Sequence, residues 1–261
     1  MNRVAAKWHI VKQTADRRLS AAAKRNISTQ QSSKDSQLWK AQGKEPPIAS
    51  LSTKDTELLS RRLTNALARG TPRHMRFRWT QPTADAAVLM LLCMANNQVS
   101  VLFQERNNQL ATHGGEICFA GGKADSTDRS LEHTALRETF EELGISEERV
   151  RIVGRLPPVP NKTGTLRVHA MVGVVCGEVE ARKLNVNRDE VHRAFALPLS
   201  HFYDPKMQEE VMFRSSHRIP IPAYASDKPG LRVWGLTAFM LYEVLCRIGS
   251  SANDYPPTPK I

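Results

Sequence analysis

Hydrophobic positions along the chain predict one folded domain over residues 51–250. In residues 53–69 the leucines recur at helical spacing and Gly70 follows, which predicts an amphipathic helix. Residues 234–247 are almost continuously apolar, so we expect a largely buried helix there. The length of 261 residues suits a single domain with additional material at an end.

Strand patterns occupy the middle of this domain. A continuous apolar run, residues 86–95, meets residues 99–103 across an Asn-Asn pair, which predicts a hairpin whose first strand is buried on both faces. Further strands are expected at residues 150–156 and 167–175, on either side of a proline-rich loop. Strands interrupted by one acidic helix and closed by an apolar helix predict an α/β fold with α+β character, in which a mixed sheet lies between helices.

Positive charge is concentrated ahead of the domain. The net charge is +11, but residues 1–44 hold ten Lys and Arg against only Asp16 and Asp35, so the rest of the chain is close to neutral. Residues 1–27 are rich in Arg and Ser and carry an apolar helical stripe, which is typical of a mitochondrial targeting leader. We therefore expect delivery to the matrix and cleavage before Ser28. A disordered basic tail that binds RNA or lipid is the alternative.

The segments that flank the domain are polar and lack periodicity. Residues 28–50 are expected to form a disordered linker, and residues 251–261, which include three prolines, a disordered tail. The final Pro-Lys-Ile lacks the Ser-Lys-Leu form of a peroxisomal address, so the peroxisome is the less favoured location. No run of 18 apolar residues exists, so no membrane span is expected.

Four cysteines are widely separated along the chain and form no CxxC pair. This spacing indicates neither a disulfide framework nor a structural zinc site. We expect all four to be reduced residues in or near the core, namely Cys93, Cys118, Cys176 and Cys246.

The segment 131–144, LEHTALRETFEELG, carries the candidate chemistry. Its acids Glu138, Glu141 and Glu142 are spaced i, i+3 and i+4, so they share one sector of a helix. Such like-charge neighbours each cost roughly 0.2–0.5 kcal/mol, whereas Mg²⁺ or Mn²⁺ binds grouped carboxylate oxygens and reverses that cost. A metal site is therefore one interpretation, and a solvated face on which Arg137 pairs with Glu141 is the other.

The opposite sector of the same helix is apolar. We expect it to pack on the domain through Leu136, Phe140 and Leu143.

Residues upstream of this helix complete a known motif. Gly121-Gly122 is followed by Asp128 and then by residues 137–145, RETFEELGI, and this pattern resembles the Nudix box. Thr139 stands where an aliphatic residue is usual, and the gap between Gly122 and Arg137 is one residue longer, with Asp128 in place of the first glutamate of the box. Both features are shared by the coenzyme A diphosphatases, in which GGxxDxxD is followed by TALRE.

The resemblance extends from about residue 86 to residue 247 and implies a Nudix fold. The chain departs from the upstream signature of the coenzyme A branch at Asn107, Ala111 and Ala120. These departures bear on coenzyme A as the substrate more than on metal-dependent hydrolysis.

The resemblance also implies a reaction and the residues that perform it. A metal-activated water would cut the diphosphate of coenzyme A or acyl-CoA, giving adenosine 3',5'-diphosphate and 4'-phosphopantetheine. By carry-over from the box, the metal ligands are Glu138, Glu142 and Glu141, and Arg137 holds the acidic face in place. The predicted catalytic residues are Arg137, Glu141, Glu142 and, outside the box, Glu190.

Residues beside the box are further candidates. Glu190 is either a distal base or metal ligand, or a solvated loop acid. Arg106 suits the substrate's diphosphate or 3'-phosphate, or is a surface charge at a strand end. Gly121 and Gly122 let the backbone approach a ligand closely.

Other aromatic and titratable residues are assigned to packing or to the surface. His113, His133 and His169 have no matching partner in sequence. Trp234 and Phe239 are expected in the core rather than as an adenine platform.

Two alternatives to the coenzyme A assignment stay open. The first is hydrolysis of another nucleoside diphosphate derivative, such as ADP-ribose, a dinucleotide or a capped RNA end. The second is a non-catalytic binding module with the Nudix fold, which the three intact acids disfavour. The expected partner is a small-molecule substrate, without a stable nucleic-acid partner or a membrane, for a monomer or homodimer.

Overall fold

The computed structural model describes most of the predicted domain. The described residues are 48, 51, 55–68, 84–213 and 219–248. The predicted leader, almost all of the linker, the tail and Gly70 lie outside the described residues. Ile48, within the predicted linker, is buried in the core, as is Leu51.

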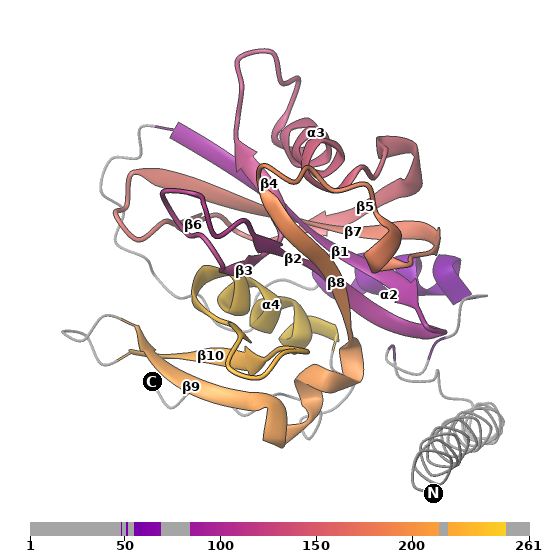
Figure 1. Cartoon of the computed structure of the whole chain (residues 1–261). Helices are drawn as coiled ribbons and strands as arrows, with labels where there is room; N and C mark the ends of the chain where they lie inside the picture. Colours follow the sequence, from indigo (N-terminus) through magenta and orange to yellow (C-terminus); the bar gives the residue numbers. More distant parts are fainter. Residues whose placement is uncertain (1–47, 49–50, 52–54, 69–83, 214–218, 249–261) are drawn as a thin grey trace, which may run out of the picture. The chain divides into compact units, whose positions relative to one another are not determined.

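The domain is built on one large mixed sheet, shown in Figure 1. Its strands are β1 (Ala84–Ala95), β2 (Gln98–Arg106), β3 (Ile117–Cys118), β4 (Ala120–Lys123), β5 (Val150–Arg155), β6 (Val159–Pro160), β7 (Leu166–Glu178) and β8 (Val191–Pro198). The main order is β3-β2-β1-β7-β5, with β4 on β1, β6 on β7 and β8 on β2. Only the β1–β7 pairing among these is parallel, so the predicted mixed sheet is confirmed.

The predicted hairpin is β1 and β2. Leu91 pairs with Leu102, and the turn residues Asn96 and Asn97 have φ values of 50° and 60°. Asparagine tolerates this left-handed region, which two-residue hairpin turns require. Alternate residues of β1 enter two separate core clusters, which confirms that both of its faces are buried.

Helices cover both faces of the sheet (Figure 1). They are α2 (Thr56–Ala68), α3 (Leu131–Leu143) and α4 (Gly235–Ile248). Leucines of α2 and α4 enter one core cluster, whereas Ala135 and Leu143 of α3 enter the other. The predicted arrangement of a sheet between helices is therefore confirmed. None of the helices in the described part of the chain is long and apolar enough to cross a membrane.

Short elements and a second sheet complete the described domain. The 3₁₀ turns are η3 (Glu147–Arg149), η4 (Ala181–Lys183), η5 (Leu199–Tyr203) and η6 (Pro205–Met207). The second sheet has the order β11-β10-β9, in which β9 is Gln208–Phe213, β10 is Ile219–Ala225 and β11 is Arg232–Val233. We did not predict this sheet, and its β10 contacts α4.

Two aromatic residues lie outside the core, contrary to prediction. Phe140 is 58% exposed, because Ala135, Thr139 and Leu143 occupy the side of α3 that faces the sheet. Trp234 is 41% exposed, because α4 begins only after it. Phe239 is partly buried and packs against the core, as predicted.

The four cysteines are free, but they differ in burial. Cys93 is buried, and Cys118 and Cys246 are half-buried. Cys176 is exposed, so its predicted place in or near the core is wrong. The reason is that β7 continues beyond its last pairing with β5, at Val175, and its final three residues face solvent.

Candidate active site

Local capping fixes the ends of the acidic helix α3. Ser130 has an extended backbone, and its hydroxyl accepts a hydrogen bond from the His133 N–H at 3.1 Å. Gly144 ends the helix in the left-handed region at φ 67°, and its N–H donates to the Phe140 carbonyl oxygen. Serine and glycine are the residues that these two positions favour, so the sequence itself sets the length of the helix.

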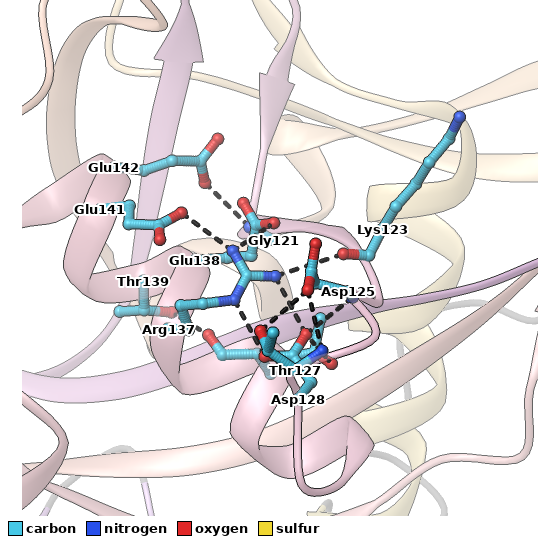
Figure 2. A network of polar contacts seen from close by, with 12 residues as sticks. Gly121, Lys123, Asp125, Thr127, Asp128, Arg137, Glu138, Thr139, Glu141 and Glu142 are labelled. Atoms are coloured by element: carbon cyan, nitrogen blue, oxygen red, sulfur yellow. Dashed lines mark hydrogen bonds and ion pairs between the residues drawn. The ribbon is translucent and has the colours of Figure 1, made fainter.

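Arg137 is the centre of a polar network in Figure 2. Its Nε and Nη2 donate to the two oxygens of Asp128 at 2.9 and 3.0 Å. Its Nη1 donates to Glu138 at 3.1 Å and to Glu141 at 2.9 Å. One guanidinium therefore offsets the repulsion among three acids.

Asp128 anchors this network beneath the helix. Its side chain is only 2% exposed, and it accepts further hydrogen bonds from Thr134, from His133 and from the Asp125 N–H. The hydrogen bonds from Arg137 hold the pKa of the Asp128 carboxyl well below its usual range, against the opposing effect of burial.

Glu142 is the most buried of the three helix acids, at 1% exposure. Its carboxylate accepts from the Gly121 N–H at 2.8 Å and lies 3.6 Å from Arg106 Nη1. Burial raises the pKa of Glu142 to about 7, although hydrogen bonds from Gly121 and Gln104 partly oppose the rise. A solvated acidic face therefore does not describe this residue.

Glu138 is less buried but is tightly enclosed. Its side chain is 16% exposed, and burial raises the pKa of its carboxyl, which Arg137 partly opposes. The Arg137–Glu141 pair exists as the alternative interpretation expected, and Glu141 is half exposed. The exposure of the three acids therefore falls from Glu141, which is half exposed, through Glu138 to Glu142, which is buried.

The two glycines of β4 make room for these carboxylates. A Cβ at Gly122 would lie 2.3 Å from Glu138 Oε1. Gly121 has φ 152°, and a Cβ there would lie 2.4 Å from the Ala87 carbonyl oxygen on the paired strand β1. Neither position can hold a larger residue unless its neighbours move.

Glu190 is brought to the edge of this site by the loop before β8. Its carbonyl oxygen accepts from the Asn107 N–H at 2.8 Å, and its side chain is 3.5 Å from Asn187 Nδ2. The charge of Glu190 contributes to the raised pKa of Glu138, so the two acids are within electrostatic reach. The Asn187 N–H in turn donates to the Glu142 carbonyl oxygen at 3.0 Å.

Arg106 ends β2 beside Glu142, with its side chain 23% exposed. Its Nε is buried and has no hydrogen-bond partner among the described residues. A surface charge at a strand end is therefore the wrong description, because the guanidinium reaches the acidic site. An unpaired buried donor next to carboxylates suits an anionic ligand.

Sequence reasoning missed the side chains that support these acids. Gln104 is fully buried on β2 and hydrogen-bonds to Glu142, and its Nε2 lies 3.6 Å from Cys118 Sγ. The available signal was a polar residue at an inward position of an otherwise apolar strand.

The three histidines all have carboxylate partners in space. His133 lies 2.9 Å from Asp128, and His169 and His113 lie near Asp85 and Glu116, at 2.7 and 3.0 Å. Asp128 and Asp85 were not apparent as partners in the sequence, because they come from a separate turn and a separate strand, whereas Glu116 lies only three residues after His113. Only His133 joins the network around Arg137, and there it supports Asp128.

A divalent cation can be tested against this donor set. Within the described part of the chain, no three His, Cys, Asp or Glu side chains converge closely enough to hold a metal ion. Glu138 and Glu141 accept hydrogen bonds from Arg137, and Glu142 accepts one from the Gly121 N–H. The three acids nevertheless present hard oxygen donors on one helix beside a glycine backbone, and donors of this type fit Mg²⁺ or Mn²⁺.

Comparisons with known proteins identify the family of the domain. The model of the NUDIX domain matches residues 83–218. The mitochondrial coenzyme A diphosphatase NUDT8 of Homo sapiens is 38% identical over 158 residues, which are 59% of this chain and 65% of the relative. Nudix hydrolase 3 of Caenorhabditis elegans is 34% identical over 174 residues, 61% of this chain and 71% of the relative.

A bacterial relative is similar to the same degree. The uncharacterized Nudix hydrolase NudL of Pectobacterium atrosepticum is 32% identical over 171 residues, 63% of this chain and 82% of the relative. The chain spans just under two thirds of the length of the human relative.

Proposed function

The chain belongs to the Nudix hydrolase family, and from this membership we propose that it cleaves the diphosphate bond of coenzyme A and acyl-CoA. The products are adenosine 3',5'-diphosphate and the corresponding 4'-phosphopantetheine. The human relative carries the name of a coenzyme A diphosphatase, which supports the choice of substrate.

One observation carries the proposal, and it concerns residue 128, where this chain departs from the general Nudix box. Asp128 replaces the first glutamate of the box, and it is the two-oxygen partner of Arg137. The same carboxylate accepts the Thr134 hydroxyl at 2.8 Å. The GGxxDxxD and TALRE segments of the coenzyme A branch are therefore one interlocked unit in this protein, which supports assignment to that branch.

Each candidate residue has a part in the proposed reaction. Glu138, Glu141 and Glu142 would hold Mg²⁺ or Mn²⁺, which when bound lowers the pKa of water and neutralises developing negative charge. Arg137 orients these acids, and Arg106 directs its donors at the diphosphate oxygens. Glu190 accepts a proton from the attacking water or completes the ligand set.

The glycines complete the proposed site. Because Gly121 and Gly122 carry no side chains, the carboxylates of Glu138 and Glu142 can lie against the backbone of β4, which fixes where they would hold the metal ion.

The first test is hydrolysis of coenzyme A by the purified protein with Mg²⁺ or Mn²⁺. Glu142→Gln should lower kcat by at least about 100-fold, because it removes a charge at the centre of the site. Glu148→Gln, an exposed acid outside the site, is the matched control and should retain full activity. Both products are measured by chromatography, and full turnover by Glu142→Gln would refute the assignment.

Substrate choice requires a second measurement with the same protein. ADP-ribose, a dinucleotide and a capped RNA are compared with coenzyme A by their kcat/KM values. We expect coenzyme A to be the best substrate. Equal values would argue for a broad diphosphatase, and the absence of turnover on every substrate would favour a binding module.

A further inference from the structure

A second feature of the domain lies beside β8, away from the helix acids. It is a cavity of about 410 Å³ between the η4 turn, the edge of β8 and the turn that joins β10 to β11. This volume is within the range of small-molecule sites in proteins. Its charged lining residues are Arg182, Arg188, Arg193, Asp227 and Lys228.

The cations of this cavity outnumber the acids that face them. Arg193 is held in place, because its Nε donates to Glu105 at 2.6 Å and its two terminal nitrogens donate to Asp227 at 2.8 and 3.1 Å. Lys228 Nζ lies 3.4 Å from the same Glu105 oxygen. Two carboxylates therefore balance two of the four cations.

The two remaining cations are available to an anion. Among the residues that the structure describes, neither Arg182 nor Arg188 is paired with a carboxylate, and both are exposed. Arg188 donates to the His192 carbonyl oxygen at 2.7 Å, which uses one of its five N–H groups. The remaining donors of both side chains are suited to phosphate.

Part of the cavity lining is apolar. Phe195 is 5% exposed, and the Arg193 guanidinium lies over its ring at 4.2 Å from the centroid. Leu184, Val186 and Ala194 add an aliphatic wall. An apolar surface combined with free guanidinium groups matches a nucleoside that carries a phosphate.

The cavity and the acidic site share one loop. Val186 and Arg188 line the cavity, and Glu190 lies two residues after Arg188. The Asn187 N–H donates to the Glu142 carbonyl oxygen, and the Arg188 carbonyl oxygen accepts from Asn107 Nδ2 at 2.8 Å. Asn107 itself follows Arg106, the residue proposed to bind the diphosphate. A substrate whose diphosphate lies at the acids can therefore extend along this loop.

We propose that this cavity binds the phosphorylated nucleoside end of the substrate, with Arg182 and Arg188 on its 3'-phosphate. The inference rests on the proposed function and deepens it, because it names the part of coenzyme A that the protein selects. A phosphate monoester carries close to two negative charges at pH 7, which the two free arginines match. Arg106 lies at the acids and serves the diphosphate instead.

Coenzyme A and 3'-dephospho-coenzyme A differ only by that phosphate, so their kcat/KM ratio tests the proposal. We expect the wild-type ratio to favour coenzyme A, and Arg182→Gln with Arg188→Gln to lower it by about tenfold for each arginine. Lys183→Gln is the matched control, because Lys183 lies on the same turn and pairs with Glu180 at 2.7 Å but does not line the cavity. A ratio unchanged within twofold in the double variant would overturn the inference and leave the proposed function standing.

A binding measurement separates the two failures. If the wild type hydrolyses neither compound, the proposed function fails, and calorimetry with adenosine 3',5'-diphosphate then decides the inference. Binding by the wild type and by Lys183→Gln that is lost in the double variant supports it, and equal or absent binding in all three overturns it. Thermal melting of each variant shows that the comparison is made on folded protein.

Discussion

At the scale of single residues, charge and burial explain the acidic site. Three carboxylates on one helix repel each other, but Arg137 pairs with Glu138 and Glu141, and Arg106 lies 3.6 Å from Glu142. Asp128 accepts two hydrogen bonds from Arg137, and Arg137 also donates to Glu138 and Glu141. Asp128 touches neither substrate nor metal in the proposal, so it is a positioning residue.

This arrangement gives a prediction for Asp128→Asn. Breaking a largely buried ion pair should destabilise the fold by about 3 kcal/mol at pH 7. Misplacing Arg137 should also lower kcat roughly 10- to 100-fold, as loss of supporting partners does at metal sites. Urea unfolding and steady-state kinetics measure the two effects, and Glu132→Gln, an exposed acid on the same helix, is the control.

The destabilisation by Asp128→Asn should also depend on pH. The pKa of Asp128 is lowered in the folded state, so its contribution is fully present above the unfolded value near 4 and is lost as pH falls toward the folded value. The difference in unfolding free energy between wild type and variant should therefore shrink below about pH 4. A difference that stays constant from pH 7 to pH 3 would contradict the ion-pair account.

At the scale of elements, the acidic helix acts as one rigid carrier for the site. Its first turn is capped by Ser130, its last turn by Gly144, and its inner side packs through Ala135 and Leu143. Gly144 lies close to Asn185, and the Asn187 N–H donates to the Glu142 carbonyl oxygen at 3.0 Å. The end of the helix is therefore in contact with the loop that carries Glu190.

Two glycines with similar backbones allow a matched test of the helix end. Gly144 and Gly177 have φ values of 67° and 83°, so alanine is strained by about 1–2 kcal/mol at either position. A Cβ at Gly144 would also lie 2.8 Å from the Asn185 carbonyl oxygen, whereas at Gly177 nothing lies within 4 Å. Gly144→Ala should therefore be the more destabilising change and should lower kcat, while Gly177→Ala should leave kcat unaltered. Thermal melting and kinetics report both, and equal effects would show that the contact with Asn185 is unimportant.

At the scale of the whole molecule, the N-terminal segment differs from the domain in its charge. Most of the excess positive charge is in residues 1–44, and the human relative is named as mitochondrial. We propose that residues 1–27 direct the protein to the mitochondrial matrix. The free cysteines of the domain suit a reducing compartment.

Targeting can be tested with the full chain carrying a C-terminal tag. In cells, the organellar protein should begin at Ser28, which N-terminal sequencing determines. Deletion of residues 1–27 should leave the protein in the cytosol, while Glu142→Gln, which does not alter the leader, should still be imported. Mitochondrial location of the deleted form would contradict the assignment.

The sequence alone predicted the elements whose signals are local. The hairpin and the acidic helix follow from apolar periodicity and turn residues that act over a few positions, and the mixed sheet was predicted from the order of strands and helices. Helical spacing grouped Glu138, Glu141 and Glu142 in one sector, whereas the roles assigned to the box residues come from the resemblance to the Nudix box and stay predictions. The β9–β11 sheet escaped prediction, because β10 contains two prolines, which disfavour a strand, and β11 has only two residues.

Tertiary structure alone decided how buried each charge is and which distant residues meet. It placed Phe140 in solvent and Glu142 in the interior, because the sheet covers a sector of α3 slightly different from the one that hydrophobicity indicated. It also brought Gln104, Arg106 and Glu190 to the acids from separate strands and loops. Burial and long-range pairing depend on the packing of the whole domain, and no local pattern in the sequence contains that information.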